Sequence, residues 1–183
     1  MMKDNLGHTH IVVLDQTNIA DINKMDNSFE VNSRIIPSIK DGQFSYTLED
    51  VPNVYTKSYP DDEVDYNTYI GNPEKVALLA YINAKAVGQI TLVKWWNKFA
   101  CVEDIRVEGN YRKMGVGTKL MDAAVSWVQG TKMPGIMLET QDTNVPACLF
   151  YQKYGFVLGG ADKMLYRGTG NSSETALFWY FVL

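Results

Sequence analysis

The stretch Val102–Gly117 carries residues that could bind an anion. It reads Val-Glu-Asp-Ile-Arg-Val-Glu-Gly-Asn-Tyr-Arg-Lys-Met-Gly-Val-Gly, so a strand pattern passes through a polar turn into Arg112-x-x-Gly115-x-Gly117 before a helical pattern begins. A strand, a loop of free backbone N–H groups and a helix N-terminus together form an anion site, which suits a phosphate or pyrophosphate. Glycine spacing alone is unspecific. The placement of these glycines before a helix indicates the chemistry.

Three carboxylates are candidates for proton transfer. Alternation along the strand Phe99–Val107 predicts that Glu103 interrupts an apolar row, where an unpaired carboxylate is costly and needs a partner or a catalytic task. Alternatively, Glu103 forms a structural ion pair or lies at an open sheet edge. Asp104 is expected on the opposite face, where Arg106 could pair with it. Glu139, late in a further short strand, ranks second because such acids are more often solvated or paired.

A run of acidic residues lies before the sharply patterned part of the chain. The net charge is −4, and the run alone carries four negative charges, so the remainder sums to zero. The run is interpreted either as a solvated loop or as a negatively charged surface that attracts a cationic substrate. The negative total argues against a nucleic-acid binder. The run consists of Asp61, Asp62, Glu63 and Asp65.

Composition predicts one soluble globular domain over residues 1–183, since 46% of the residues are apolar and 21% are charged. No basic start leads into a long apolar run, and the longest apolar run, Ala176–Leu183, is far below the ~20 residues of a membrane helix. We therefore expect a cytoplasmic protein that binds no membrane. Cys101 and Cys148 lie in apolar patterns that indicate reduced thiols. His8 and His10 lack further ligands, so no metal is expected.

Periodicity predicts strands joined first by turns and later by helices, which is typical of an α/β fold with a mixed sheet. The segment 29–59 is expected to be loop-rich, with one or two strands. Elsewhere the predicted strands are 10–14, 76–82, 87–94, 99–107, 136–140, 156–158, 164–166 and 176–182, and the predicted helices are 116–129 and 147–154, with a weak helix or turn over 15–25.

Two motifs together resemble the GNAT acyltransferase superfamily. They are Arg112-x-x-Gly115-x-Gly117 after a strand, and Asn144 followed downstream by Phe150-Tyr151-Gln-Lys-Tyr-Gly155-Phe156. The resemblance is strongest to streptothricin acetyltransferases and covers most of residues 29–183, whereas residues 1–28 match weakly. It implies a GNAT-like, mainly antiparallel twisted sheet flanked by helices. The segments that carry this narrower resemblance are Tyr55-Thr-Lys-Ser-Tyr59, Trp96-Asn97, Val102-Glu-Asp-Ile105, Leu138-Glu-Thr-Gln-Asp142, Asn144-Val-Pro-Ala-Cys148 and Phe178-Trp-Tyr180.

The resemblance implies acetyl-CoA as the donor. The backbone of Ile105, Arg106 and Val107 would pair with the pantetheine arm and the acetyl group. Asn144 would touch the cofactor, and Tyr151 would face the thioester sulfur. One departure is visible, because Lys113 stands where the superfamily often has glycine. The pyrophosphate would be cradled by Arg112, Lys113, Met114, Gly115, Val116 and Gly117.

The resemblance also implies an acceptor, the β-lysine amine of the cationic antibiotic streptothricin. The acidic run and Tyr59 suit such a substrate. Polyamines, other cationic amines or protein lysines are alternative acceptors, and a non-catalytic acyl-CoA-binding module is a further alternative. An aromatic final strand leaves room for a homodimer.

An amine must lose a proton before it attacks a thioester, and for a lysine-like ammonium the neutral form costs about 4.6 kcal/mol at pH 7. Glu103 is the expected base, directly or through a water, and Asp104 and Glu139 are alternates. Tyr151 would hydrogen-bond to, or protonate, the leaving thiolate. Core packing is its alternative role.

Overall fold

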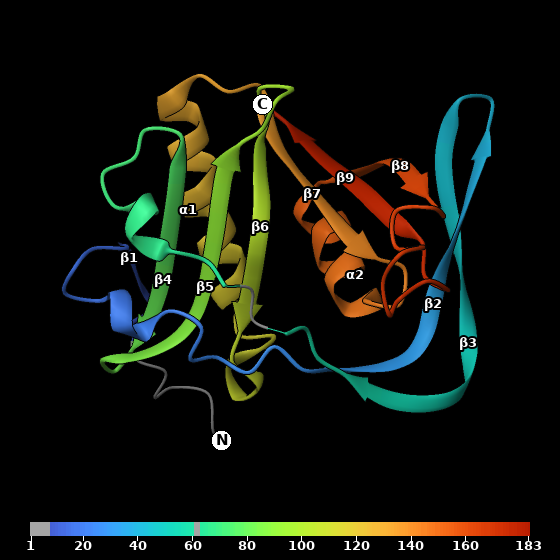
Figure 1. The fold of residues 1–183 in the computed structure, drawn as a ribbon, viewed down its shortest axis with the longest axis horizontal. Coiled ribbons are helices and arrows are strands. Elements are labelled where there is room, and N and C mark those ends of the chain that lie inside the picture. The colour runs from blue at the N-terminus through green and yellow to red at the C-terminus, as the bar shows by residue number, and fades with distance from the viewer. Residues whose placement is uncertain (1–7, 61–62) are drawn as a thin grey trace. The chain divides into compact units, whose positions relative to one another are not determined.

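The computed structural model describes residues 8–60 and 63–183. Its contacts divide the chain into two compact units, each of which is described by itself. The first unit comprises residues 8–27 and 59–135, and the second comprises residues 28–58 and 136–183. Figure 1 gives the elements of both. No helix of the described part of the chain is long and apolar enough to cross a membrane.

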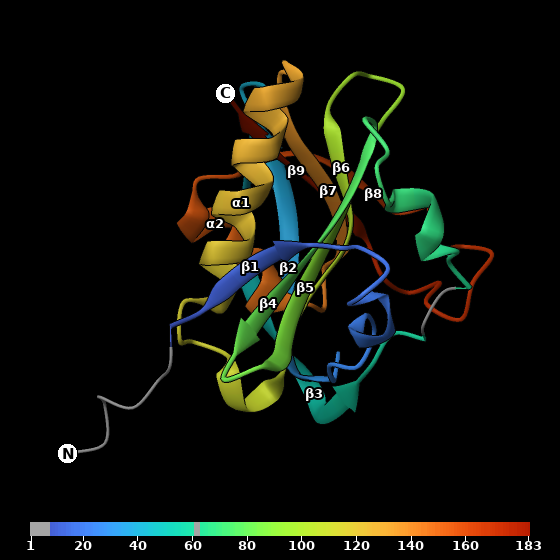
Figure 2. The ribbon, with the colours of Figure 1, turned by 90° about the vertical axis from the view of Figure 1, so that its left-hand side faces the viewer.

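The first unit is a layer of antiparallel strands with a helix on one face. Its strand order is β1-β4-β5-β6, and α1 lies against these strands (Figure 2). The predicted strands and the predicted helix are confirmed, although α1 runs through Gly130 to Thr131. The elements are β1 (His10–Val13), η1 (Ile19–Asp21), η2 (Tyr66–Tyr69), β4 (Lys75–Ile82), β5 (Lys85–Lys94), β6 (Ala100–Val107), η3 (Gly109–Tyr111) and α1 (Val116–Thr131).

Two local features set the geometry of this unit. Asn83 and Ala84 join β4 to β5 with φ of +50° and +62°, as a type I′ hairpin turn requires. Gly88 lets α1 approach β5 closely, because a Cβ there would lie 3.1 Å from side-chain atoms of both Leu120 and Val116. The start of α1 is therefore seated directly on the sheet.

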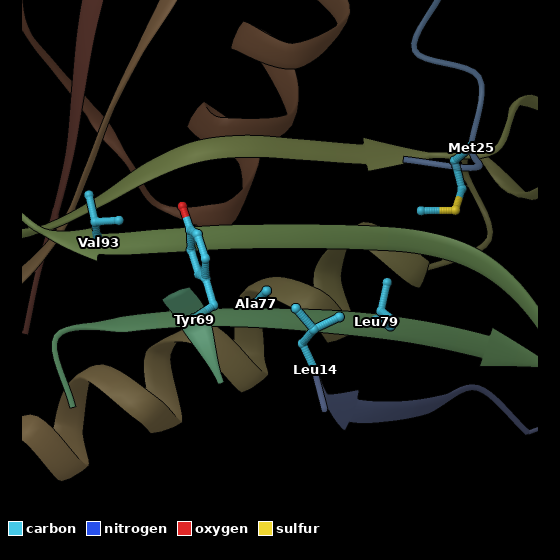
Figure 3. Packing of buried hydrophobic residues seen from close by; sticks show 6 residues of the cluster. All are labelled: Leu14, Met25, Tyr69, Ala77, Leu79 and Val93. Atoms are coloured by element: carbon cyan, nitrogen blue, oxygen red, sulfur yellow. The ribbon is translucent and has the colours of Figure 1, made fainter. Parts of the chain in front are cut away.

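One face of the first unit is closed by the N-terminal segment and η2. Leu14 and Met25 pack with Tyr69 and with strand residues in one buried cluster (Figure 3). Residues 8–27 thus contribute both an edge strand and part of the core. The strand residues of the cluster are Ala77, Leu79 and Val93.

The second unit contains a strand group in the order β7-β9-β8, the helix α2 and a separate hairpin of β2 and β3. The loop-rich expectation for residues 29–59 is wrong, because this segment forms two long strands. Prolines fit there because the hairpin has only edge strands, and Pro52 lies in an irregularity where four residues, 51–54, oppose Asn32. The elements are β2 (Phe29–Lys40), β3 (Gln43–Lys57), β7 (Gly135–Gln141), α2 (Val145–Tyr154), β8 (Val157–Asp162) and β9 (Ala176–Val182).

Helix α2 ends as predicted, with Gly155 in the left-handed conformation at φ +118°. The predicted strand over Met164–Tyr166 is wrong, because these residues form a turn. Asp162 Oδ1 accepts hydrogen bonds from the backbone N–H groups of Met164 and Leu165, which stabilises this turn. The predicted α/β fold of mainly antiparallel strands with flanking helices is confirmed in both units.

Candidate active site

The segment between β6 and α1 has the backbone of an anion loop. Lys113 and Gly115 take positive φ, at +62° and +84°, and α1 starts at Val116 without a side-chain cap. The first N–H groups of a helix have no partner within the helix, and the helix dipole adds positive potential there. The loop can thus accept a phosphate on backbone donors. Lys113 occupies the left-handed conformation, which favours glycine.

The Arg112 side chain holds the loop in place. Its Nε donates to the Val107 carbonyl oxygen at 2.8 Å, and its Nη2 donates to the Asp26 carbonyl oxygen at 3.0 Å. The Asp26 N–H in turn donates to Glu108 Oε2 at 3.1 Å. Arg112 therefore ties the end of β6 to the N-terminal segment, a structural task that the motif alone did not reveal.

Glu103 lies at a β-bulge in β6. Thr91 pairs with Asp104 and Leu92 pairs with Val102, so Glu103 has no counterpart on β5. The expectation of simple alternation along this strand is therefore wrong beyond Val102, and Glu103 is exposed rather than buried in an apolar row. Its Oε2 accepts a hydrogen bond from the Tyr69 hydroxyl. A bulge aims side chains in directions that regular pleating forbids, and bulges are frequent beside active sites.

Asp104 is held by two neighbours. Arg106 Nε donates to its Oδ2 at 3.0 Å, which is the ion pair that the sequence suggested. Gln89, fully buried, donates to the same oxygen at 2.5 Å and also bonds Asn23 through its Nε2 and its Oε1. Asp104 is thus part of a structural network, and Glu103 is the more accessible carboxylate of β6.

Glu139 combines an exposed side chain with a perturbed carboxyl. It is the one exposed residue of β7. Desolvation by the surrounding protein nevertheless raises the pKa of its carboxyl to about 7. A carboxyl with this pKa exchanges protons readily near neutrality, as a general base or acid must.

Asn144 and Tyr151 belong to the second unit. Asn144 is the N-cap of α2, where its Oδ1 accepts from the Ala147 N–H at 3.3 Å. Tyr151 is 5% exposed, and its ring centroid lies 5.6 Å from that of Phe150 and 5.8 Å from that of Phe156. Its ring therefore packs in an aromatic cluster, and the proposed role of its hydroxyl stays a prediction.

The acidic run is described only in part. Asp61 and Asp62 lie outside the described residues. Glu63 is exposed, whereas Asp65 caps η2 by accepting from the Asn67 N–H at 3.1 Å. The Tyr59 carbonyl oxygen accepts from Asn27 at 2.7 Å, which fixes the backbone where the run begins.

Polar contacts between residues far apart in the chain escaped sequence reasoning, and each unit gives one example. One is the Tyr69–Glu103 hydrogen bond across 34 positions. The other is in the second unit, where the Lys57 ammonium contacts Glu174 at 2.5 Å and Gln141 at 2.6 Å in a largely buried setting. No local pattern signals either contact, because both depend on tertiary pairing.

Burial makes the Cys148 thiol a poor nucleophile. Both thiols are free, and burial raises the pKa of Cys148 to about 12. Among the described residues, no cluster of three or more His, Cys, Asp or Glu side chains is placed to hold a metal ion.

Comparison with known proteins places this geometry in a family. The acetyltransferase (GNAT) family model matches residues 44–156. Streptothricin acetyltransferase A of Bacillus subtilis (strain 168) is 40% identical over 93% of this chain and 98% of its own. Streptothricin acetyltransferase of Escherichia coli is 34% identical over 96% of this chain and 87% of its own.

A solved structure agrees with these relatives. The crystal structure of a Bacillus anthracis str. Ames protein in complex with acetyl coenzyme A superposes with a TM-score of 0.90 at 41% identity. The match covers 96% of this chain and 100% of that chain. The strand–loop–helix geometry, the family model and the full-length similarity agree, and the chain belongs to the acetyltransferase (GNAT) family.

Proposed function

We propose that this protein transfers the acetyl group of acetyl-CoA to the β-lysine amine of streptothricin and so confers resistance to that antibiotic. The observation that carries the proposal is the 40% identity to a streptothricin acetyltransferase over nearly the whole of both chains. Acetylation removes a positive charge from the antibiotic. We also propose that residues 1–183 form one acetyltransferase domain, since the family match over 44–156 includes residues of both units.

The residues of the β6–α1 loop fit the donor. The uncapped start of α1 and the left-handed residues Lys113 and Gly115 offer backbone N–H groups to a pyrophosphate. The ammonium of Lys113 adds a positive charge to this loop, and Arg112 keeps the loop attached to β6. Acetyl-CoA supplies an activated thioester when bound. Ile105, Arg106 and Val107, immediately before the loop, are proposed to pair with its pantetheine arm.

A carboxylate is proposed to deprotonate the acceptor amine. The cost of about 4.6 kcal/mol at pH 7 for a lysine-like amine is the barrier contribution that a base can reduce. Glu103 is the proposed base because it is exposed and held in one orientation by Tyr69. Glu139 is the alternate, supported by the raised pKa of its carboxyl. Asp104 is the least suited of the three, since its carboxylate already accepts hydrogen bonds from Arg106 and Gln89.

The remaining proposed roles concern charge and the leaving group. Glu63 and Asp65 with the rest of the acidic run provide negative potential for a cationic substrate. Tyr151 is proposed to stabilise the departing thiolate through its hydroxyl. Asn144 is proposed to touch the donor through its side-chain amide.

A single assay tests the function. The purified protein is incubated with acetyl-CoA and streptothricin, and thiol release and product mass are followed. Addition of one acetyl group to the β-lysine moiety is the expected result. Turnover on polyamines, aminoglycoside-like amines or lysine peptides, with none on streptothricin, would contradict the proposed acceptor. Binding of acetyl-CoA without thiol release toward any amine would contradict an enzyme.

A further inference from the structure

The ring of Tyr69 is buried and packs against several side chains. It is 5% exposed and packs with Leu14, Ala77 and Val93, and Figure 3 shows its hydroxyl at the end of the ring that points away from Ala77 and Leu14. The Lys75 ammonium lies over the ring, 5.2 Å from its centroid. The hydroxyl therefore has a single position relative to the strands of the first unit.

The short helix η2 that carries Tyr69 is itself anchored. Asp65 caps it, and its Asn67 accepts a hydrogen bond from Gln16 Nε2 at 3.1 Å. The Tyr66 hydroxyl donates to Asn23 Oδ1 at 3.2 Å. Contacts from the N-terminal segment thus hold η2 against the sheet.

In contrast to Tyr69, Glu103 has an exposed side chain, and it lies on a bulge where no residue of β5 pairs with it. The hydrogen bond from Tyr69 engages its Oε2. An exposed glutamate otherwise samples several rotamers, and fixing it costs conformational entropy. A rigid donor placed against one carboxylate oxygen selects one rotamer and leaves Oε1 to meet a proton.

We propose that Tyr69 is the positioning residue of this acetyltransferase: its hydroxyl orients the Glu103 carboxylate, so that Oε1 receives the proton of the acceptor amine. This inference rests on the proposed function and assigns a role to a residue outside the family motifs. It also gives Asp65 a second task, because the acidic run ends in the cap of the helix that delivers Tyr69.

The electrostatics around the pair agree with this role. Burial, and then the hydrogen bond to Glu103, raises the pKa of the Tyr69 hydroxyl far above its usual range, so it remains a donor at every working pH. The other titratable or charged groups around the pair are Tyr66 on η2, Lys75 on β4, and Asp104 with its partner Arg106 on β6.

The first experiment observes the hydrogen bond without requiring turnover. A strong hydroxyl-to-carboxylate bond gives a low-field proton resonance in one-dimensional NMR of the whole protein. Tyr69→Phe should abolish this resonance, and Glu103→Gln should move it upfield. Tyr66→Phe is the matched control, since it removes a hydroxyl from the same helix that is bonded to Asn23. A resonance that survives Tyr69→Phe would overturn the proposal.

The second experiment measures the consequence for catalysis with the amine that the protein acetylates. Tyr69→Phe keeps the ring and its packing, so we expect kcat to fall about tenfold with an unchanged KM for acetyl-CoA. In a Glu103→Gln background the same substitution should have no further effect on kcat.

The two proposals fail in different ways. If the wild-type protein acetylates streptothricin but Tyr69→Phe behaves as Tyr66→Phe does, or if the effects of Tyr69→Phe and Glu103→Gln are additive, the positioning role is wrong and the function stands. If the low-field resonance behaves as expected but the protein acetylates only other amines, the acceptor assignment fails and the positioning role stands.

Discussion

Gln89 Nε2 donates to Asp104 Oδ2 at 2.5 Å, and this contact joins β5 to β6 through two side chains, of which Gln89 is fully buried. The same amide bonds Asn23, so the N-terminal segment is connected to the strand that carries Glu103. A carboxylate held in this way is a poor mobile base. The two neighbouring acids of β6 therefore have separate tasks, one structural and one exposed for chemistry.

Asp104→Asn should cost stability more than it costs turnover. The substitution removes the carboxylate charge that pairs with Arg106, whose side chain is 9% exposed, and we expect a loss of about 2 kcal/mol in the free energy of unfolding. Glu103→Gln should show the reverse, with stability nearly unchanged and kcat lowered at least tenfold. Urea unfolding and steady-state kinetics on both variants check this. Equal losses of kcat would contradict the division of tasks.

Lys57→Met should destabilise the second unit strongly. It leaves Glu174, whose side chain is 8% exposed, as a buried charge without its ammonium partner, and the expected loss is about 3–5 kcal/mol. The double variant Lys57→Met/Glu174→Leu should recover much of this loss. Lys94→Met is the control, because the Lys94–Glu74 pair is 34% and 62% exposed and is expected to contribute under about 1 kcal/mol. Urea denaturation followed by circular dichroism measures all three.

Gly115→Ala should weaken acetyl-CoA binding through the backbone alone. A Cβ there meets nothing within 4 Å, but φ is +84°, so the loop conformation would cost about 1–2 kcal/mol and the Kd would rise roughly tenfold. Lys113→Gly should relax the same kind of strain and raise stability, yet lose one cation. Lys113→Gln isolates the loss of charge. Calorimetry at two salt concentrations separates these effects, and a salt-independent Kd in the wild type would contradict a role for the lysine charge.

Local sequence patterns were sufficient to predict the first unit, because the apolar residues of its strands and its helix recur with the period of a strand or a helix. The segments 76–82 and 87–94 are short apolar strands with a two-residue turn, and α1 has a regular apolar face. The Arg112–Gly117 motif then located the anion loop. In each case the residues that define the feature are close together in the sequence.

Features that depend on tertiary pairing escaped prediction. The bulge at Glu103 is a register shift between β5 and β6, and no pattern within β6 alone records it. The hairpin of β2 and β3 has many exposed residues and two prolines, so it lacks the clean alternation of a half-buried strand. The Tyr69 hydroxyl reaches Glu103 only because η2 folds back onto the sheet.

Glu139→Gln should make the stability of the protein less dependent on pH between about pH 4.5 and pH 7. The pKa of the carboxyl is raised from an ordinary value of 4.5 to about 7, so the folded state favours the protonated form. In the wild type this contribution is fully present below pH 4.5 and is lost as pH rises through 7. The variant should therefore melt at a higher temperature than wild type at pH 8.5 and at a similar temperature at pH 4. Thermal melts at both values test this, and Glu63→Gln, on an exposed acid, is the control.

Tyr151→Phe separates packing from chemistry at α2. The ring contacts with Phe150 and Phe156 survive this substitution, so the melting temperature should stay within about a degree of wild type. If the hydroxyl stabilises the departing thiolate, kcat should fall about 10- to 100-fold while acetyl-CoA binding is kept. The matched control is Tyr154→Phe, which removes a hydroxyl from the same helix and preserves a ring that also packs on Phe156.

The size of the Tyr151 effect also distinguishes two forms of catalysis. With ordinary pKa values of about 10 for a phenol and 8.5 for a thiol, complete proton transfer from tyrosine to thiolate is uphill by about 2 kcal/mol. A hydrogen bond without transfer avoids this cost, so a leaving thiol of lower pKa should narrow the gap between Tyr151→Phe and wild type. Acyl donors with graded thiol pKa values measure that slope. A gap that is constant across the series would contradict a contact between the Tyr151 hydroxyl and the leaving sulfur.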